Sequence, residues 1–65
     1  MRKTTVAAAL TVGAFVVEER RGPQGFEAVA FEVTAVETDR RGVVHYRLAS
    51  GEVRSLHGTV QVRVA

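Results

Sequence analysis

The sequence predicts an all-β protein: one small antiparallel sheet of five strands, strongly bent. Apolar and polar residues alternate through residues 43–48, and apolar residues recur at every second position from Val60 to Val64. This is the period of a strand with one buried face. The apolar residues are mostly valine and alanine, and valine favours strands over helices. Polar segments that contain glycine separate the apolar stretches, as expected for turns between strands.

The composition limits the classes of protein that this chain can belong to. Its 65 residues predict a single domain over residues 1–65, and a chain this short buries only about 60% of its unfolded surface. A closed barrel, or association with copies of itself, would compensate for the small core. There is no cysteine, so no disulfide or thiolate metal site is predicted. The net charge of +2 permits a polyanionic partner without requiring one.

The N-terminal segment has two interpretations. Arg2 and Lys3 precede an apolar run over residues 6–17, which resembles the start of a signal peptide. The run is too short to span a bilayer, which takes about 20 apolar residues. We favour a long first strand that bends near Gly13, in a chain that is cytoplasmic and makes no membrane contact. A short helix over residues 6–10 is the local alternative.

Both faces of this first strand carry apolar side chains. Leu10, Val12 and Val16 would face the core, which leaves Phe15 and Val17 on the opposite face. A strand with one exposed face should not carry them, so we expect a second cover or a contact between subunits. The predicted oligomer-interface residues are Leu10, Val12, Phe15 and Val17.

The remaining elements follow from turn residues and periodicity. Residues 18–25 are polar and contain the only proline, so they predict a loop. Residues 26–38 predict a second long strand, in which a bulge near residues 34–35 would return Val36 to the core. Residues 39–42 predict a turn, and Ser50-Gly51 predicts a tight two-residue hairpin turn.

This plan resembles the small barrels of the Src-homology-3, Tudor and KOW type. The likeness rests on residues 11–14, residues 33–36, the Ser50-Gly51 hairpin and residues 56–59. It implies a sheet that closes into a barrel, with a 3₁₀ turn before the last strand and Leu56 plugging one end. Members of this group bind nucleic acids, peptides or modified side chains, or assemble into rings. The sequence has only four aromatic residues and no tryptophan, so an aromatic cage or a proline-binding groove is not predicted.

Arginines on neighbouring strands predict an anion-binding face. A two-residue hairpin turn would place Arg47 directly opposite Arg54, and such a like-charge pair is unfavourable unless an anion or an acid lies between them. The alternative is pairing with Glu32, Glu37 or Glu52. The predicted nucleic-acid-binding residues are Arg40, Arg41, Arg47, Arg54 and Arg63.

No catalytic or metal site is predicted. His45 and His57 lack an evident third metal ligand, and no motif frames Ser50 or Ser55 as a nucleophile. We therefore predict a non-catalytic binding module without a cofactor or metal, which contacts nucleic acid through the arginine face. The alternative is a structural or accessory protein that acts by protein–protein contacts and forms a homo-oligomer. So small a chain would suit a bacteriophage or plasmid genome.

Overall fold

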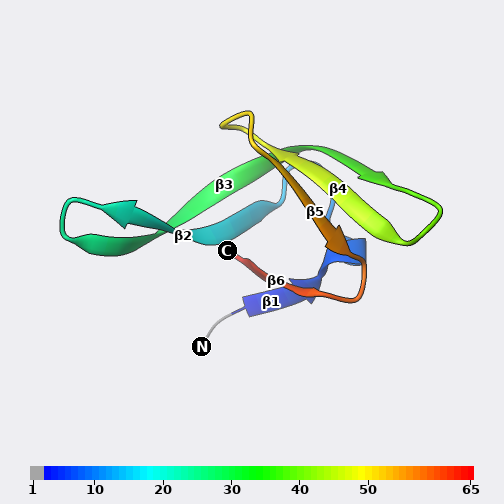
Figure 1. Cartoon of the computed structure of the whole chain (residues 1–65), viewed down its shortest axis with the longest axis horizontal. Helices are drawn as coiled ribbons and strands as arrows, with labels where there is room; N and C mark the ends of the chain where they lie inside the picture. Colours follow the sequence, from blue (N-terminus) through cyan, green and yellow to red (C-terminus); the bar gives the residue numbers. More distant parts are fainter. Residues whose placement is uncertain (1–2) are drawn as a thin grey trace.

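A computed structural model describes residues 3–65 as a single antiparallel sheet with no α-helix (Figure 1). The sheet has six strands in the order β1-β6-β2-β3-β4-β5. The elements are β1 (Lys3–Val6), the 3₁₀ turn η1 (Ala7–Ala9), β2 (Phe15–Gly22), β3 (Gly25–Thr38), β4 (Val43–Leu48), β5 (Val53–His57) and β6 (Gln61–Val64). The all-β prediction is confirmed, but β1 and β5 are not paired with each other. The sheet is therefore open, and the predicted closed barrel is not confirmed.

The N-terminal segment is not the single long strand that the sequence predicted. It divides into β1, η1 and a turn, because backbone groups of η1 bond to the segment before β6: the N–H of Ala7 donates to the carbonyl of Val60 at 2.8 Å. Gly13 then reverses the chain with φ +96°, a conformation that favours glycine. Leu10 is buried as predicted, but Val12 is 64% exposed, since it lies in this turn. Met1 and Arg2 lie outside the described residues.

The β2–β3 hairpin replaces the predicted polar loop over residues 18–25. β2 continues through Gly22, and only Pro23 and Gln24 connect it to β3. Backbone pairing runs without interruption to Gly22 opposite Gly25, because strand pairing uses main-chain groups and tolerates charged side chains on exposed faces. The hairpin projects from one end of the molecule (Figure 1).

The bend in β3 is confirmed. The register with β4 shifts between Val33 and Ala35, which is the signature of a bulge. The extra residue restores the inward parity, so that Val36 is half-buried against the core opposite Tyr46. The bulge lets β3 pair with β2 through its first half and with β4 through its second half.

The β4–β5 hairpin is one residue longer than predicted. The N–H of Leu48 donates to the carbonyl of Glu52 at 2.8 Å, and Gly51 closes the three-residue loop with φ +93°. The added residue changes the register, so that Arg54 lies opposite Tyr46 and not opposite Arg47. A shift of one residue moves a side chain to the other face of the sheet. The predicted Arg47–Arg54 pair is therefore wrong.

The core lies in the concavity of this curled sheet. Tyr46 and Leu48 point inward from β4, and Val16 meets them from β2. The buried hydrophobic residues are Ala7, Leu10, Val16, Val33, Val44, Tyr46, Leu48 and Val62. Leu56 is half-buried and packs against this cluster. Within residues 3–65 no helix is long and apolar enough to cross a membrane.

Candidate functional site

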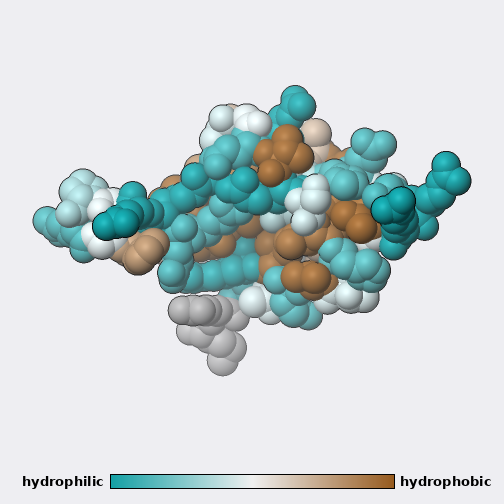
Figure 2. All heavy atoms as spheres, viewed as in Figure 1, coloured by the Kyte–Doolittle hydropathy of each residue, from teal (hydrophilic) through white to brown (hydrophobic). Residues whose placement is uncertain are grey.

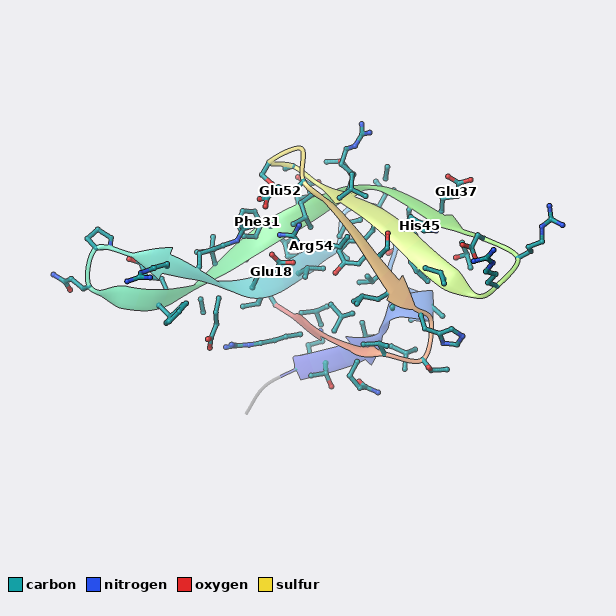
Figure 3. All side chains as sticks on the ribbon, in the orientation of Figure 1. Glu18, Phe31, Glu37, His45, Glu52 and Arg54 are labelled. Atoms are coloured by element: carbon teal, nitrogen blue, oxygen red, sulfur yellow. The ribbon has the colours of Figure 1, made fainter. Side chains whose placement is uncertain are left out.

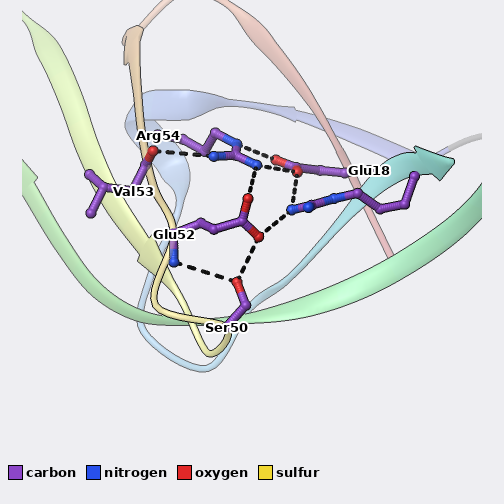
Figure 4. Close-up of polar contacts among 6 residues, drawn as sticks. Glu18, Ser50, Glu52, Val53 and Arg54 are labelled. Carbon is purple, nitrogen blue, oxygen red and sulfur yellow. Dashed lines mark hydrogen bonds and ion pairs between the residues drawn. The ribbon is translucent and has the colours of Figure 1, made fainter.

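An ion cluster connects β2 to the start of β5 (Figures 3 and 4). The Nε and Nη2 atoms of Arg54 donate to the two carboxylate oxygens of Glu18 at 3.0 and 2.9 Å. Nη2 of Arg20 donates to Glu52 at 2.6 Å and to Glu18 at 3.2 Å, and Arg54 reaches Glu52 at 3.1 Å. Since β3 and β4 lie between β2 and β5 in the sheet, the cluster is a clamp across the concave side.

The clamp neutralises its own charges. Hydrogen bonds from Arg20, Arg54 and Ser50 lower the pKa of Glu52 to about 2, and the bonds to Glu18 and Glu52 raise the pKa of Arg54. The guanidinium carbon of Arg20 also lies 4.7 Å from the centre of the Phe31 ring, a favourable cation–π contact. Two acids and two arginines leave no net charge, so Arg54 does not belong to an exposed anion-binding face.

The clamp predicts that the protein loses stability in acid. Because the pKa of Glu52 is lowered in the folded state, its stabilising contribution is present above the unfolded pKa, near 4.5, and is lost as the pH falls toward about 2. We expect the urea midpoint to fall between pH 5 and pH 2.5, and to fall less in Glu52→Gln. Equal acid sensitivity of the two proteins would contradict this role of Glu52.

The other predicted arginines are not gathered on one surface. Arg47 is exposed on the outer, convex face of β4, whereas Arg40 and Arg41 are exposed in the turn between β3 and β4. Arg63 is half-buried on β6, near the other end of the sheet order. In the part of the chain that the structure describes, none of these four forms an ion pair.

The outer face of β3, β4 and β5 carries a row of polar side chains. The strand register aligns Glu37, His45 and Ser55 across the three strands. His45 bonds through Nδ1 to Ser55 Oγ at 2.7 Å and through Nε2 to Asp39 Oδ2 at 3.0 Å. An open groove of about 320 Å³ lies beside His45 and is lined by residues of β3, β4 and β5. The two-residue turn predicted from the sequence, which places Arg47 opposite Arg54, would also place His45 opposite Leu56, so the sequence did not predict this cluster.

The β2–β3 hairpin bears the exposed aromatic residues. Phe15 is 47% exposed and Phe26 is 74% exposed, and both lie on the face opposite the clamp. Val17 is half-buried on the same face, whereas Leu10 is buried in the core and offers no surface to a partner in this structure. Figure 2 shows the clamp-side view, where apolar atoms gather around β5 and β6 and the hairpin is mostly polar. A subunit contact through Val12, Phe15 and Val17 stays a prediction.

Within residues 3–65 no group of three histidine or acidic side chains could hold a metal ion. Comparison with known proteins found no family model, no curated protein and no solved structure that matches this chain. The resemblance to the Src-homology-3, Tudor and KOW barrels therefore stays a prediction.

Proposed function

We propose that this chain is a binding module that works through protein contacts, and that it pairs with a second copy of itself along the edge of β2. One observation carries the proposal: beyond the Val16–Val64 pair, no strand among residues 3–65 covers this edge of β2. An uncovered strand edge presents backbone donors and acceptors, and natural proteins use such edges for strand addition.

The geometry of the hairpin identifies the backbone groups that are available. Residues that flank a two-residue hairpin turn exchange both backbone hydrogen bonds, and Gly22 and Gly25 are the flanking pair here. The direction of the main-chain N–H and C=O groups alternates along a strand, so those of Arg20, two residues before Gly22, also face β3. Those of Glu19 and Arg21 point to the open edge, with the same parity as Phe15, whose carbonyl accepts from Ala65 at 3.0 Å.

The charges along this edge are complementary to those of an identical, antiparallel edge. A two-fold axis beside Arg20 places Glu19 opposite Arg21 of the partner subunit, and Arg21 opposite Glu19 of the partner subunit. These pairs lie on the outer face and have opposite charges, the favourable arrangement for directly opposed residues. Arg20 meets its own copy on the inner face, where Glu18 and Glu52 already neutralise it.

Charge exchange at this edge tests the proposal. We expect the wild-type protein to sediment as a dimer at high micromolar concentration. Glu19→Arg and Arg21→Glu should each give a monomer, because each places like charges opposite one another. The double variant Glu19→Arg/Arg21→Glu should restore the dimer, and Arg40→Glu, an equal charge change in the β3–β4 turn, should leave it intact. A monomeric wild-type protein would overturn the proposal, as would a double variant that stays monomeric.

A second candidate function is nucleic-acid binding through the exposed arginines of β4 and of the β3–β4 turn. It is favoured by the three exposed arginines Arg40, Arg41 and Arg47, which have no carboxylate partner within the described residues. Guanidinium groups bind phosphate oxygens bidentately. Fluorescence anisotropy with labelled oligonucleotides should show affinity that falls with salt, with a slope of about 0.9 per phosphate contact on duplex DNA. Changing all three to alanine should reduce the slope, and no binding at low salt would exclude this function.

The curled sheet also supports placing this chain near the small barrels that its sequence resembles. The bulged β3, the short hairpin between β4 and β5, and the clamp from β2 to β5 bring the two halves of the sheet toward each other. We propose that the fold is an open form of such a barrel, with β1 as an added edge strand.

A further inference from the structure

Three side chains on the convex side form a continuous hydrogen-bonded chain. Oδ2 of Asp39 lies 3.0 Å from Nε2 of His45, and Nδ1 of the same ring lies 2.7 Å from Oγ of Ser55. We propose that Ser55 is an activated nucleophile that cleaves small esters, with His45 as its general base and Asp39 as the positioning residue. This activity is independent of the pairing along β2.

The direction of the hydrogen bonds follows from the acid. An ionised carboxylate can only accept, so the Asp39 bond fixes the proton of neutral His45 on Nε2. The lone pair of Nδ1 then faces Ser55, whose hydroxyl donates to it. This is the arrangement that a serine nucleophile needs, with the roles of the two ring nitrogens exchanged relative to the usual serine–histidine–aspartate triad.

The Asp39 carboxylate is held in place by the β3–β4 turn. Its second oxygen, Oδ1, accepts from the backbone N–H groups of Arg41 at 2.8 Å and Val43 at 3.1 Å. The bonds from His45 and from these amides lower the pKa of Asp39 below its usual range and so favour its ionised form. His45 and Ser55 are directly opposite in the β4–β5 register, so the sheet fixes their separation.

The adjoining groove indicates the class of substrate. Its volume of about 320 Å³ is at the lower end of the range for small-molecule sites. Ala35 and Val53 supply an apolar surface, and Arg47 supplies a positive charge at the same groove. A groove of this size suits an ester with a small acyl chain, and Arg47 favours an acyl chain that ends in a carboxylate.

The reaction conserves atoms and charge in two steps. Ser55 Oγ forms a bond to the carbonyl carbon while its proton passes to Nδ1 of His45, and that proton is then given to the departing alcohol oxygen as the ester C–O bond breaks. Water then attacks the acyl carbon while His45 takes its proton, and His45 gives that proton to Ser55 Oγ as the bond between Oγ and the acyl carbon breaks. The products are the alcohol and the carboxylic acid, and Ser55 is regenerated.

The chain contains its own control. Nδ1 of His57 lies 2.9 Å from Oγ1 of Thr59, so a second histidine–hydroxyl pair lies at the end of β5. No acidic side chain among residues 3–65 is bonded to His57. If hydrolysis needed only a histidine, His57 and His45 should therefore contribute equally. If it needs the bound serine and acid, only His45 should contribute.

Hydrolysis of p-nitrophenyl acetate and of mono-p-nitrophenyl succinate tests the proposal. Ser55→Ala and His45→Gln should each lower kcat/KM by about 100-fold or more, whereas His57→Gln and Thr59→Val should leave it unchanged. Asp39→Asn should reduce kcat, and Asp39→Glu should restore part of it. Arg47→Ala should raise KM for the succinate ester alone.

Covalent labelling separates chemistry from folding. A fluorophosphonate probe should add once to the wild-type chain, and peptide mapping should place the adduct on Ser55. Ser55→Cys, which keeps a nucleophile at this position, should be acylated by the acetate ester if the variant keeps the circular dichroism spectrum of the wild type. Unchanged hydrolysis in Ser55→Ala, or the absence of an adduct on Ser55 in the folded wild-type protein, would overturn the proposal.

Discussion

Replacing Leu48 with alanine is expected to lower the free energy of unfolding by about 2–5 kcal/mol. Leu48 is fully buried, at 0% exposure, and is one of the largest fully buried side chains. It lies opposite Val33, directly before the β3 bulge. A domain of this length has a total stability of only about 3–10 kcal/mol. The variant should therefore be close to its unfolding threshold at room temperature.

Urea titration followed by far-ultraviolet circular dichroism measures this loss, since the chain has no tryptophan to report on folding. Val53→Ala is the matched control, because Val53 is 53% exposed on the convex face of the neighbouring strand. It should change the free energy of unfolding by about 0.5 kcal/mol or less. Equal midpoints for the Leu48→Ala variant and the wild type would mean that Leu48 does not occupy the core.

The sequence was sufficient where burial follows a local period. Val44, Tyr46 and Leu48 are buried as their alternation predicted, and the position of Val36 required the bulge that the structure contains. These predictions depend on neighbouring residues in one strand, whose side chains must alternate between two faces. The same reasoning wrongly predicted a loop for the charged segment at the end of β2. This segment pairs with β3 through main-chain bonds, which the polarity of the side chains does not predict.

The candidate sites depended on distances that a sequence does not contain. One additional residue in the β4–β5 loop moved Arg54 to the concave side, where it binds Glu18, 36 positions earlier in the chain. The same change in register placed Ser55 opposite His45. A strand pattern predicts which residues share a face, but the loop length decides which residues are opposite each other across two strands. The sequence contains both His45 and Ser55, but their contact depends on this register.

Replacing Gly58 with valine is expected to lower the free energy of unfolding by about 1–3 kcal/mol, the usual cost of overpacking. A Cβ atom at Gly58 would lie 3.0 Å from Cβ of Ala8 and 3.3 Å from the carbonyl oxygen of Gly42. That carbonyl accepts from the Gly58 N–H at 2.8 Å, and the Gly58 carbonyl accepts from Ala8 at 3.0 Å. The side chain would therefore separate η1 from the β3–β4 turn.

A second substitution distinguishes this steric cause from a general loss of glycine flexibility. Ala8→Gly removes the nearest atom, so Gly58→Val/Ala8→Gly should be more stable than the sum of the two single effects predicts, by about 0.5 kcal/mol or more. Thr59→Val, at the next and exposed position, should have a small effect. Strictly additive effects would show that Gly58 and Ala8 are not in contact. Gly58 lies between β5 and β6, which are not paired with each other, so its contacts join η1 to the β3–β4 turn at a point where no strand pairing does so.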